Sequence, residues 1–212
     1  MDRLYRNQRR FYDLTRKYYL FGRDRLIREL DLRPGETLAE IGCGTARNLI
    51  VIARRYPGTT LYGLDASSEM LKTAQAAVAK AELSDRIKFA QGYAEAFRPA
   101  QVGIHKPLNI IVFSYSLSMI PNWRAALAAA GAALAPRGRV HVVDFGDLAG
   151  LPRPVARLLH AWLSQFHVAP REILLQEAEV GADLPGRKLA LLPGRYAFLL
   201  SASGDDPILA PP

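Results

Sequence analysis

Short, strongly apolar segments alternate with longer Ala- and Leu-rich stretches, and this alternation limits the fold more than any other feature of the chain. The apolar segments are TLAEIG (37–42), TLYGLD (60–65), LNIIVFSY (108–115), RVHVVDFG (139–146) and a weaker RIKFAQG (86–92). Such near-continuous hydrophobicity is typical of strands that are covered on both faces. The stretches with helical character are 46–55, 67–82 and 122–134. Strand and helix in alternation predict βαβ units and a parallel sheet.

The end of the chain predicts an antiparallel finish to this sheet. GRKLALLPGRYAFLLSAS, at 186–203, holds two apolar runs around a Pro-Gly turn, which is typical of a hairpin. We therefore expect a single α/β domain over 37–204, with seven mostly parallel strands, helices on both faces and an antiparallel last strand. The Tyr- and Arg-rich segment 1–36 is expected to form a helical cap or lid, and 205–212 a flexible tail.

The composition excludes some classes of protein and leaves others open. The 212 residues carry a net charge of +8, which favours nucleic acid, anionic lipid or acidic substrates without choosing among them. A single cysteine excludes an intrachain disulfide and a Cys-rich zinc site, and four scattered histidines show no ligand spacing, so we expect no metal. No apolar signal core begins the chain, and no stretch reaches the ~20 apolar residues of a transmembrane helix. We expect a cytoplasmic protein.

Two glycines follow the first predicted strand and begin the first predicted helix. At the carboxyl end of a strand in an open α/β sheet, Gly42 and Gly44 would let a ligand lie against the main chain. A dinucleotide-binding loop would have a third glycine at position 47, where helix and strand pack closely. Arg47 occupies that position, so the dinucleotide fingerprint fails.

Asp65 ends the second predicted strand, where a carboxylate can accept hydrogen bonds from both hydroxyls of a ribose. Charge-assisted bonds of this kind contribute about 1.5–3 kcal/mol each. Ser67 is a candidate cap for the helix that follows, and Met70, one turn on, is a candidate to face an adenine ring. A helix-capping acid without any ligand is the alternative for Asp65.

Preceded by Glu40, the run Gly-Cys-Gly-Thr-Ala resembles the class I S-adenosylmethionine-dependent methyltransferases, whose commonest pattern has glycine in place of Ala46. The resemblance covers roughly 36–146 and implies a Rossmann-like methyltransferase fold with S-adenosyl-L-methionine as cofactor. The cofactor-binding residues expected on this basis are Tyr12, Tyr19, Arg23, Glu40, Gly42, Cys43, Gly44, Asp65, Ala66, Met70, Tyr93, Ala94, Glu95, Ser114, Tyr115 and Ser116. Tyr93 and Glu95 are alternative partners for the adenine.

Three further segments narrow the resemblance. YDLTRKYYLFGRDRLI (12–27), FHVAPRE (166–172) and GRYAFL (194–199) are similar to bacterial diacylglyceryl-homoserine N-methyltransferases. The first is more distantly similar to the ubiquinone/menaquinone methyltransferases. The closer resemblance implies three successive methyl transfers to the amino group of a homoserine lipid headgroup, which give a betaine lipid.

Methyl transfer from a sulfonium needs positioning and water exclusion more than a strong base. Tyr115 and His167 are nevertheless candidates to accept or relay a proton, and a buried structural histidine is an equal alternative for His167. Tyr12 and Tyr19 are candidates to hold cationic intermediates by cation–π attraction. We expect Arg171 to bind the substrate carboxylate, a role for which Arg23 is also a candidate. Tyr196 is likewise expected to bind substrate.

The segment 151–168 has apolar residues at helical spacing, with basic residues between them. Such a helix either packs on the sheet or lies at the headgroup level of an anionic membrane. In the second case the protein would be peripheral at the inner face of the membrane.

Three other functions fit parts of the sequence. The first is methylation of a quinone or another small molecule at carbon or oxygen. The second is an RNA-binding or RNA-modifying protein, but no RNA-binding motif or Pro-Pro-Tyr signature is present, so no nucleic-acid partner is expected. The third is a cofactor-binding module without catalysis.

Overall fold

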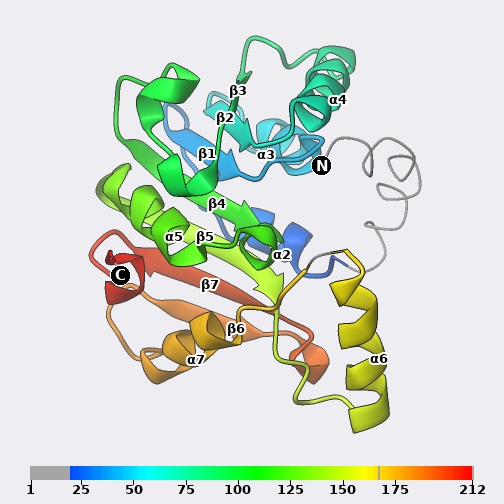
Figure 1. The fold of residues 1–212 in the computed structure, drawn as a ribbon. Helices are drawn as coiled ribbons and strands as arrows, with labels where there is room; N and C mark the ends of the chain where they lie inside the picture. The colour runs from blue at the N-terminus through cyan, green and yellow to red at the C-terminus, as the bar shows by residue number, and fades with distance from the viewer. Residues whose placement is uncertain (1–19, 167, 212) are drawn as a thin grey trace.

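The computed structural model describes residues 20–166 and 168–211 and has a seven-stranded sheet between two layers of helices (Figure 1). The strand order is β3-β2-β1-β4-β5-β7-β6. Every neighbouring pair from β3 to β5 is parallel, whereas β7 runs antiparallel to both β5 and β6. The predicted α/β fold with an antiparallel last strand is confirmed.

The strands correspond closely to the apolar segments of the sequence. They are β1 Thr37–Ile41, β2 Thr60–Asp65, β3 Ile87–Gln91, β4 Leu108–Ser114, β5 Leu134–Phe145, β6 Lys188–Leu191 and β7 Ala197–Ser203. The described α-helices are α2 Arg23–Arg28, α3 Arg47–Arg55, α4 Ser68–Lys80, α5 Trp123–Ala132, α6 Arg153–Ser164 and α7 Glu172–Val180. Short 3₁₀ turns connect several of them, including η3 Leu117–Met119 and η5 Pro207–Leu209.

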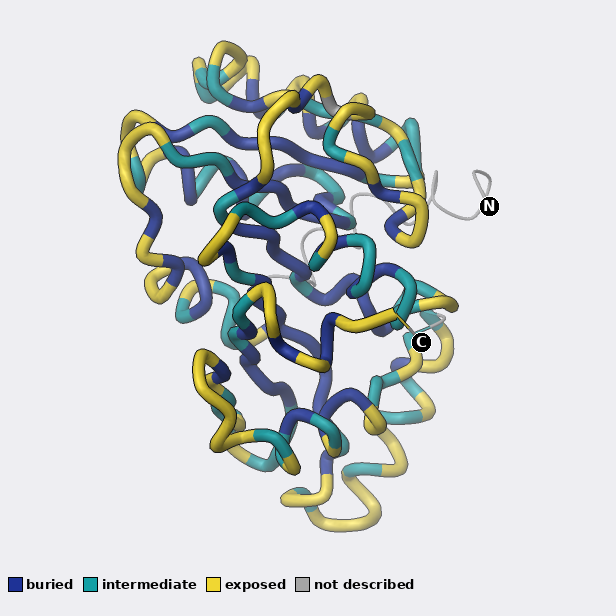
Figure 2. Tube along the Cα trace, turned by 90° about the vertical axis from the view of Figure 1, so that its left-hand side faces the viewer, coloured by how far each residue is buried: buried dark blue, intermediate teal, exposed yellow. Residues whose placement is uncertain are grey.

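Both faces of the sheet are buried, which explains why the strands are apolar almost throughout (Figure 2). On β4, Ile111 and Phe113 point into a core shared with α5 and α7. Ile110 and Val112 point into a second core on the side of α2, α3 and α4. Each such side chain contributes about 1.5–3 kcal/mol to the free energy of folding when it is fully buried. The two cores therefore hold the strands, and with them the loops at the strand ends, in place.

The short helix α2 is the described part of the expected N-terminal cap. Leu26 and Ile27 are buried, and the Tyr56 hydroxyl of the loop after α3 donates to the Ile27 carbonyl at 2.8 Å. Gly22 precedes α2 with φ of 86°, and a Cβ at this position would meet three apolar side chains at 3.1–3.2 Å. Residues 1–19 lie outside the described residues, so the division at 36 stays a prediction.

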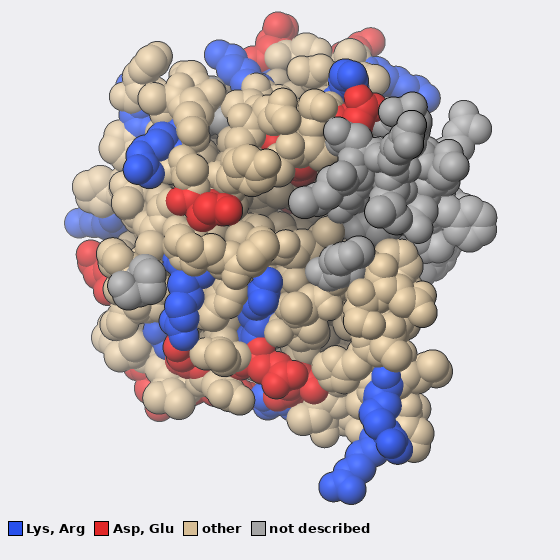
Figure 3. All heavy atoms as spheres, viewed as in Figure 1, with Lys and Arg blue, Asp and Glu red and all other residues tan. Residues whose placement is uncertain are grey.

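The helix α6 stands apart from the other helices because Leu163 is its only buried residue. It carries two arginines, Arg153 and Arg157, both exposed. Figure 3 shows Lys and Arg side chains projecting at the lower right, where Figure 1 has α6. Within 20–166 and 168–211, no helix combines the length and apolar character needed to cross a membrane.

The expectation of a flexible tail at 205–212 is wrong for the residues described. Ile208 and Leu209 are buried in the core beside α5 and α7. Asp206 is buried and forms an ion pair with Arg187, whose Nε donates to Asp206 Oδ2 at 2.8 Å. Asp206 Oδ1 also accepts from the Ile208 amide at 2.9 Å, which caps η5. The packing could not be predicted from the short Pro- and Asp-rich segment itself, because the ion pair depends on Arg187, which precedes β6.

Replacing Asp206 by Ala should lower the free energy of unfolding by about 3–5 kcal/mol, because the Arg187 guanidinium would stay buried without its counter-charge. Urea denaturation at pH 7 measures the change. The matched control is Asp205→Ala, at the exposed neighbouring acid, which should stay within about 0.5 kcal/mol of the wild type. Equal effects of the two substitutions would contradict the assignment of the ion pair.

Candidate cofactor and acceptor site

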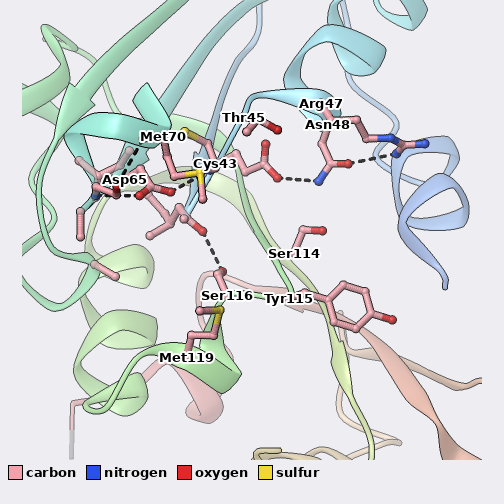
Figure 4. Close-up of a pocket in the computed structure, with 18 of the residues that line it drawn as sticks. Cys43, Thr45, Arg47, Asn48, Asp65, Met70, Ser114, Tyr115, Ser116 and Met119 are labelled. Atoms are coloured by element: carbon pink, nitrogen blue, oxygen red, sulfur yellow. Dashed lines mark hydrogen bonds between the residues drawn. The ribbon is translucent and has the colours of Figure 1, made fainter. Parts of the chain in front are cut away.

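A cavity of about 990 Å³ lies where β1, β2 and β4 end, at the edge where open parallel sheets bind ligands (Figure 4). The loops after β1, β2, β3 and β4 and the first turns of α3 and α4 line it. The residues of the predicted cofactor set that line it are Arg23, Glu40, Gly42, Cys43, Gly44, Asp65, Ala66, Met70, Tyr93, Ala94, Glu95, Ser114, Tyr115 and Ser116. Tyr12 and Tyr19 lie outside the described residues.

The loop after β1 follows a tight left-handed path against the end of β2. Gly42, Gly44 and Ala46 have φ of 75°, 54° and 63°. The Gly42 amide donates to the Leu64 carbonyl at 2.8 Å, and a Cβ on Gly42 would lie 2.5 Å from Ser116 Cβ. Ala46 adopts its left-handed conformation at a cost of about 1–2 kcal/mol. Glycine adopts it freely, which explains the glycine that the commonest methyltransferase pattern has at position 46.

The first turn of α3 faces the cavity without a side-chain cap. Its N-cap residue is Ala46, which has no side chain able to accept a hydrogen bond from the helix. The first amides of a helix have no partner within the helix, and with the helix dipole they favour a negatively charged group. A carboxylate at the amino-acid end of a cofactor has this charge.

Asp65 joins the loop after β1 to the start of α4. Its Oδ2 accepts from the Gly44 amide at 2.8 Å, and its Oδ1 accepts from the Ser67 amide at 2.9 Å. The Ser67 hydroxyl in turn accepts from the Met70 amide at 3.3 Å, which confirms the predicted helix cap. Each carboxylate oxygen has a second lone pair, so Asp65 can also accept hydroxyl hydrogen bonds from the cavity. The ribose contact itself stays a prediction.

Glu40 provides a buried negative group on the cavity wall. It is 1% exposed, and its Oε1 accepts from Asn48 Nδ2 at 2.7 Å, while Oε2 has no partner among the described residues. Burial raises the pKa of Glu40 to about 7, an effect that the Asn48 hydrogen bond and the Arg23 charge partly oppose. An unpaired carboxylate oxygen beside a cavity fits a cationic group of a ligand, such as an ammonium.

The set of site residues predicted from the sequence contains neither Asn48 nor Arg47. Arg47 stands out in the sequence only because a dinucleotide-binding loop would have glycine at that position. Arg47 Nη1 donates to Asn48 Oδ1 at 3.2 Å, and its Nη2 donates to Asp24 Oδ1 of α2 at 2.8 Å. A polar chain therefore runs from Glu40 through α3 to α2 (Figure 4). The signal in the sequence is an amide side chain in the first turn of the helix that follows an acid-bearing strand, whereas the partner on α2 gives no local signal.

Tyr93, Glu95 and Met70 all line the cavity. Tyr93 is 66% exposed and Glu95 is exposed, whereas Met70 is buried. An exposed aromatic ring at a cavity rim can cover a flat ligand group. Tyr93 and Glu95 stay the two predicted partners of the adenine.

The end of the cavity formed by β4 and the loop after it is mainly hydroxylic and apolar. Ser114, Ser116, Met119, Ile120 and Pro121 line it. The Ser116 hydroxyl donates to the Ile41 carbonyl at 2.8 Å, whereas the buried Ser114 Oγ has no hydrogen-bond partner among the described residues. We call this region the acceptor end.

Tyr115 is poorly placed to accept a proton. Its φ of 55° turns the ring away from Asp65 and Cys43 (Figure 4), and its hydroxyl donates to the Phe21 carbonyl at 2.6 Å. Burial raises the pKa of Tyr115 well above its ordinary value, and the nearby Tyr196 and Asp144 add to the shift. The phenol is therefore neutral near pH 7, with its proton already engaged.

Arg171 lies behind the acceptor end and does not line the cavity. Its Nε donates to the Leu117 carbonyl at 2.9 Å and its Nη2 to the Ile120 carbonyl at 2.7 Å. From the other side, the Ser118 amide donates to the buried Asp144 Oδ2 at 3.0 Å. In this arrangement Arg171 holds the acceptor loop, instead of reaching into the cavity as the expected role in carboxylate binding requires.

Tyr196 and His167 complete the predicted set. Tyr196 does not line the cavity, and its ring packs edge-on against Phe21 and Phe145, with centroids 5.5 and 5.8 Å apart. Tyr196 thus contributes to an aromatic cluster that also supports Tyr115. His167 lies outside the described residues. In the part of the chain that the structure describes, no cluster of three or more metal-ligating side chains occurs.

Comparison with known proteins shows that the chain is similar in sequence to methyltransferases. The model of a methyltransferase domain family matches residues 39–140. A trans-aconitate 2-methyltransferase of Streptomyces avermitilis is 35% identical over 101 residues, which are 48% of this chain and 36% of that protein. A ubiquinone/menaquinone biosynthesis C-methyltransferase of Syntrophotalea carbinolica is 28% identical over 170 residues, 76% of this chain and 65% of that protein. The chain thus spans between about a third and two thirds of the length of these relatives.

A solved structure agrees on the fold. An S-adenosylmethionine-dependent methyltransferase from Aquifex aeolicus superposes with a TM-score of 0.60 at 17% identity, covering 89% of this chain and 92% of that one. The fold is that of the class I methyltransferases, and residues 39–140 match a methyltransferase domain family. In sequence the chain is similar to the ubiquinone/menaquinone and trans-aconitate methyltransferases named above.

The residues present fit S-adenosylmethionine. The unpaired Glu40 oxygen suits its ammonium, and the uncapped turn of α3 suits its carboxylate. Gly42 lines the cavity and lets Ser116 pack against the loop, and the Asp65 carboxylate can accept from ribose hydroxyls. We infer these contacts with S-adenosylmethionine from the charge and the hydrogen-bonding capacity of the residues that line the cavity.

Asp65→Ala should weaken binding of S-adenosylmethionine tenfold or more, which corresponds to about 1.4 kcal/mol, because the hydroxyl acceptor and the support of the Gly44 amide are both lost. Titration calorimetry gives the dissociation constant, and circular dichroism verifies that the variant is folded. Asp85→Ala, at an exposed acid before β3, is the matched control. An unchanged constant in a folded Asp65→Ala protein would remove the ribose assignment.

The raised pKa of Glu40 makes cofactor binding depend on pH. An ammonium beside Glu40 stabilises the ionised carboxylate, so affinity should rise about tenfold between pH 6 and pH 8 as the carboxyl of the free protein ionises near 7. The folding stability of the free protein depends on pH in the opposite direction to cofactor affinity. Because the folded pKa exceeds the ordinary 4.5, the stabilising contribution of the protonated carboxyl is complete below pH 4.5 and is lost as pH rises through 7.

Calorimetry over this range, in buffers of different ionisation enthalpy, measures both the affinity and the proton release. In Glu40→Gln the binding should be weaker and the pH profile flat. Identical profiles for the wild type and Glu40→Gln would show that another group causes the dependence.

Proposed function

We propose that this chain transfers three methyl groups in succession from S-adenosylmethionine to the amino group of a diacylglyceryl-homoserine lipid and so forms a betaine lipid. The cofactor, when bound, supplies an electrophilic methyl group on its sulfonium. The segments 12–27, 166–172 and 194–199 carry the resemblance to enzymes of this kind. The runner-up is a small-molecule acceptor.

The observation that carries the proposal is the chemistry of the acceptor end. Among the described residues, the lining between Ser114 and Pro121 contains no carboxylate, histidine or lysine, and Tyr115 holds its proton against Phe21. An amine becomes nucleophilic by losing a proton to water. With an α-amino pKa of ~8, this loss costs about 1.4 kcal/mol per pH unit below that value. Methylation of a ring carbon needs a base held at the substrate, and none of these lining residues is one.

The exposed face of α6 supports a lipid substrate. Leu158 is 74% exposed and Val155 is 50% exposed, and Arg153 and Arg157 lie on the same helix. Apolar residues beside basic ones suit the headgroup level of an anionic membrane, where each basic residue contributes about 1 kcal/mol. We propose that α6 contacts the inner face of the membrane and that the protein is peripheral there.

The chain after α6 leads directly to the acceptor end. The Ala169 amide donates to the Ser118 carbonyl at 2.9 Å, and Arg171 binds the carbonyls on either side of Ser118. A helix that meets the membrane is thereby linked to the loop that would receive the headgroup. In this arrangement Arg171 is a positioning residue.

A second candidate function rests on the relatives. They are named for methylation of trans-aconitate and for C-methylation in ubiquinone/menaquinone biosynthesis. A soluble polycarboxylate or a quinol is therefore the alternative acceptor.

Transfer of labelled methyl groups distinguishes these acceptors. The purified protein is incubated with labelled S-adenosylmethionine and, in parallel, with diacylglyceryl-homoserine in anionic vesicles, trans-aconitate and a demethylmenaquinol. We expect label in the lipid headgroup alone, distributed over one, two and three methyl groups. Label in a small molecule with none in the lipid would replace the proposal by the second candidate.

A pair of matched variants tests the membrane role of α6 in the same assay. Leu158→Ser should lower the lipid-dependent rate several-fold, because an apolar side chain at the interface is lost. Ile173→Ser removes a 57% exposed side chain from α7 and should leave the rate unchanged. Equal rates for the two variants would argue against contact through α6.

A further inference from the structure

A second cavity, of about 580 Å³, lies between α2 and the strands β5, β7 and β6. It shares no lining residue with the cofactor cavity. Its charged and histidine lining residues are Arg25, Glu29, Asp31, Arg139, His141 and Lys188. A polar cavity of this size admits a small molecule and not merely one water, whose share of liquid volume is about 30 Å³.

Three of the polar residues form one row across three strands. His141 of β5 pairs with Ser201 of β7, and Ser201 pairs with Lys188 of β6. Paired residues of neighbouring strands point to the same face of a sheet. Arg139, two residues before His141, lies on that face as well. On β5 the next residue of the same face is the fully buried Val143, so the polar row is a local departure from an apolar surface.

Two buried atoms of this row lack hydrogen-bond partners in the described part of the chain. They are His141 Nε2 and Ser201 Oγ, and His141 is only 6% exposed. A buried polar group without a partner costs about 1–3 kcal/mol, so such groups are usually completed by a bound molecule. Burial and the neighbouring Arg139 lower the pKa of His141 to about 4, which leaves a neutral imidazole able to donate one hydrogen bond.

The charges around the row are unbalanced. Arg25 Nε contacts Glu29 Oε1 at 2.7 Å, so these two charges compensate each other. Arg139 and Lys188 have no acidic partner among the described residues. Asp31 is the one remaining carboxylate of the lining. Two uncompensated cations against one acid favour a negatively charged ligand.

We propose that this second cavity binds a small anion with carboxylate or phosphate groups, held by Arg139 and Lys188 and by a hydrogen bond from His141. The Ser201 hydroxyl faces the same anion from the neighbouring strand. The site is separate from the proposed methyl transfer, and it stands whichever acceptor the cofactor cavity serves.

Calorimetric titration with inorganic phosphate and with malonate tests the proposal. We expect saturable binding of one anion per chain, and the stronger of the two ligands identifies the favoured group. Arg139→Gln and Lys188→Gln should each weaken this binding tenfold or more. The matched control is Arg137→Gln, at an exposed arginine of the same strand that does not line the cavity.

His141→Leu provides a readout that does not depend on charge. It should weaken anion binding several-fold while stability is kept or increased, because the unpaired nitrogen is removed. Absence of saturation by both anions would overturn the proposal. So would binding that survives Arg139→Gln and Lys188→Gln unchanged, because the anion would then lie elsewhere.

Discussion

The hydrogen bond from the Gly44 amide to Asp65 Oδ2, 2.8 Å long, is the contact on which the cofactor side of the site depends. It holds the loop after β1 against the end of β2, and the other carboxylate oxygen holds the Ser67 amide at the start of α4. One side chain thereby positions the uncapped turn of α3 and the helix that carries Met70. A substitution of Asp65 therefore acts both on ligand contacts and on the shape of the wall.

The acceptor side is built on the same plan, with a carboxylate at the end of a strand that holds a neighbouring loop. Asp144, near the end of β5, accepts from the Ser118 amide, and Arg171 binds the carbonyls of the same loop from the opposite side. These groups occupy the back of the loop, so its cavity face stays hydroxylic and apolar. This division explains how an acceptor end can be rigid without offering an acid or base to the substrate.

The sheet and the cofactor side could be predicted from the sequence because their signals are local. Strands covered on both faces are continuously apolar, and Asp65 stands at a strand end that alternation alone defines. The remaining features depend on contacts between distant segments. The row of His141 and Lys188 exists only because β7 lies between β5 and β6, and the burial of Asp206 requires Arg187. Tyr115 is a candidate base by residue type, but its left-handed φ directs it away.

We expect S-adenosylmethionine to bind in the cavity at the ends of β1, β2 and β4. Hydrogen–deuterium exchange with and without the product S-adenosylhomocysteine tests it most directly, because it locates the ligand on the chain. We expect slower exchange in 42–48, 65–70 and 91–95, with no change around 139–141 and 188–201. Unchanged exchange in the first three segments at saturating ligand, or protection confined to other segments, would contradict it.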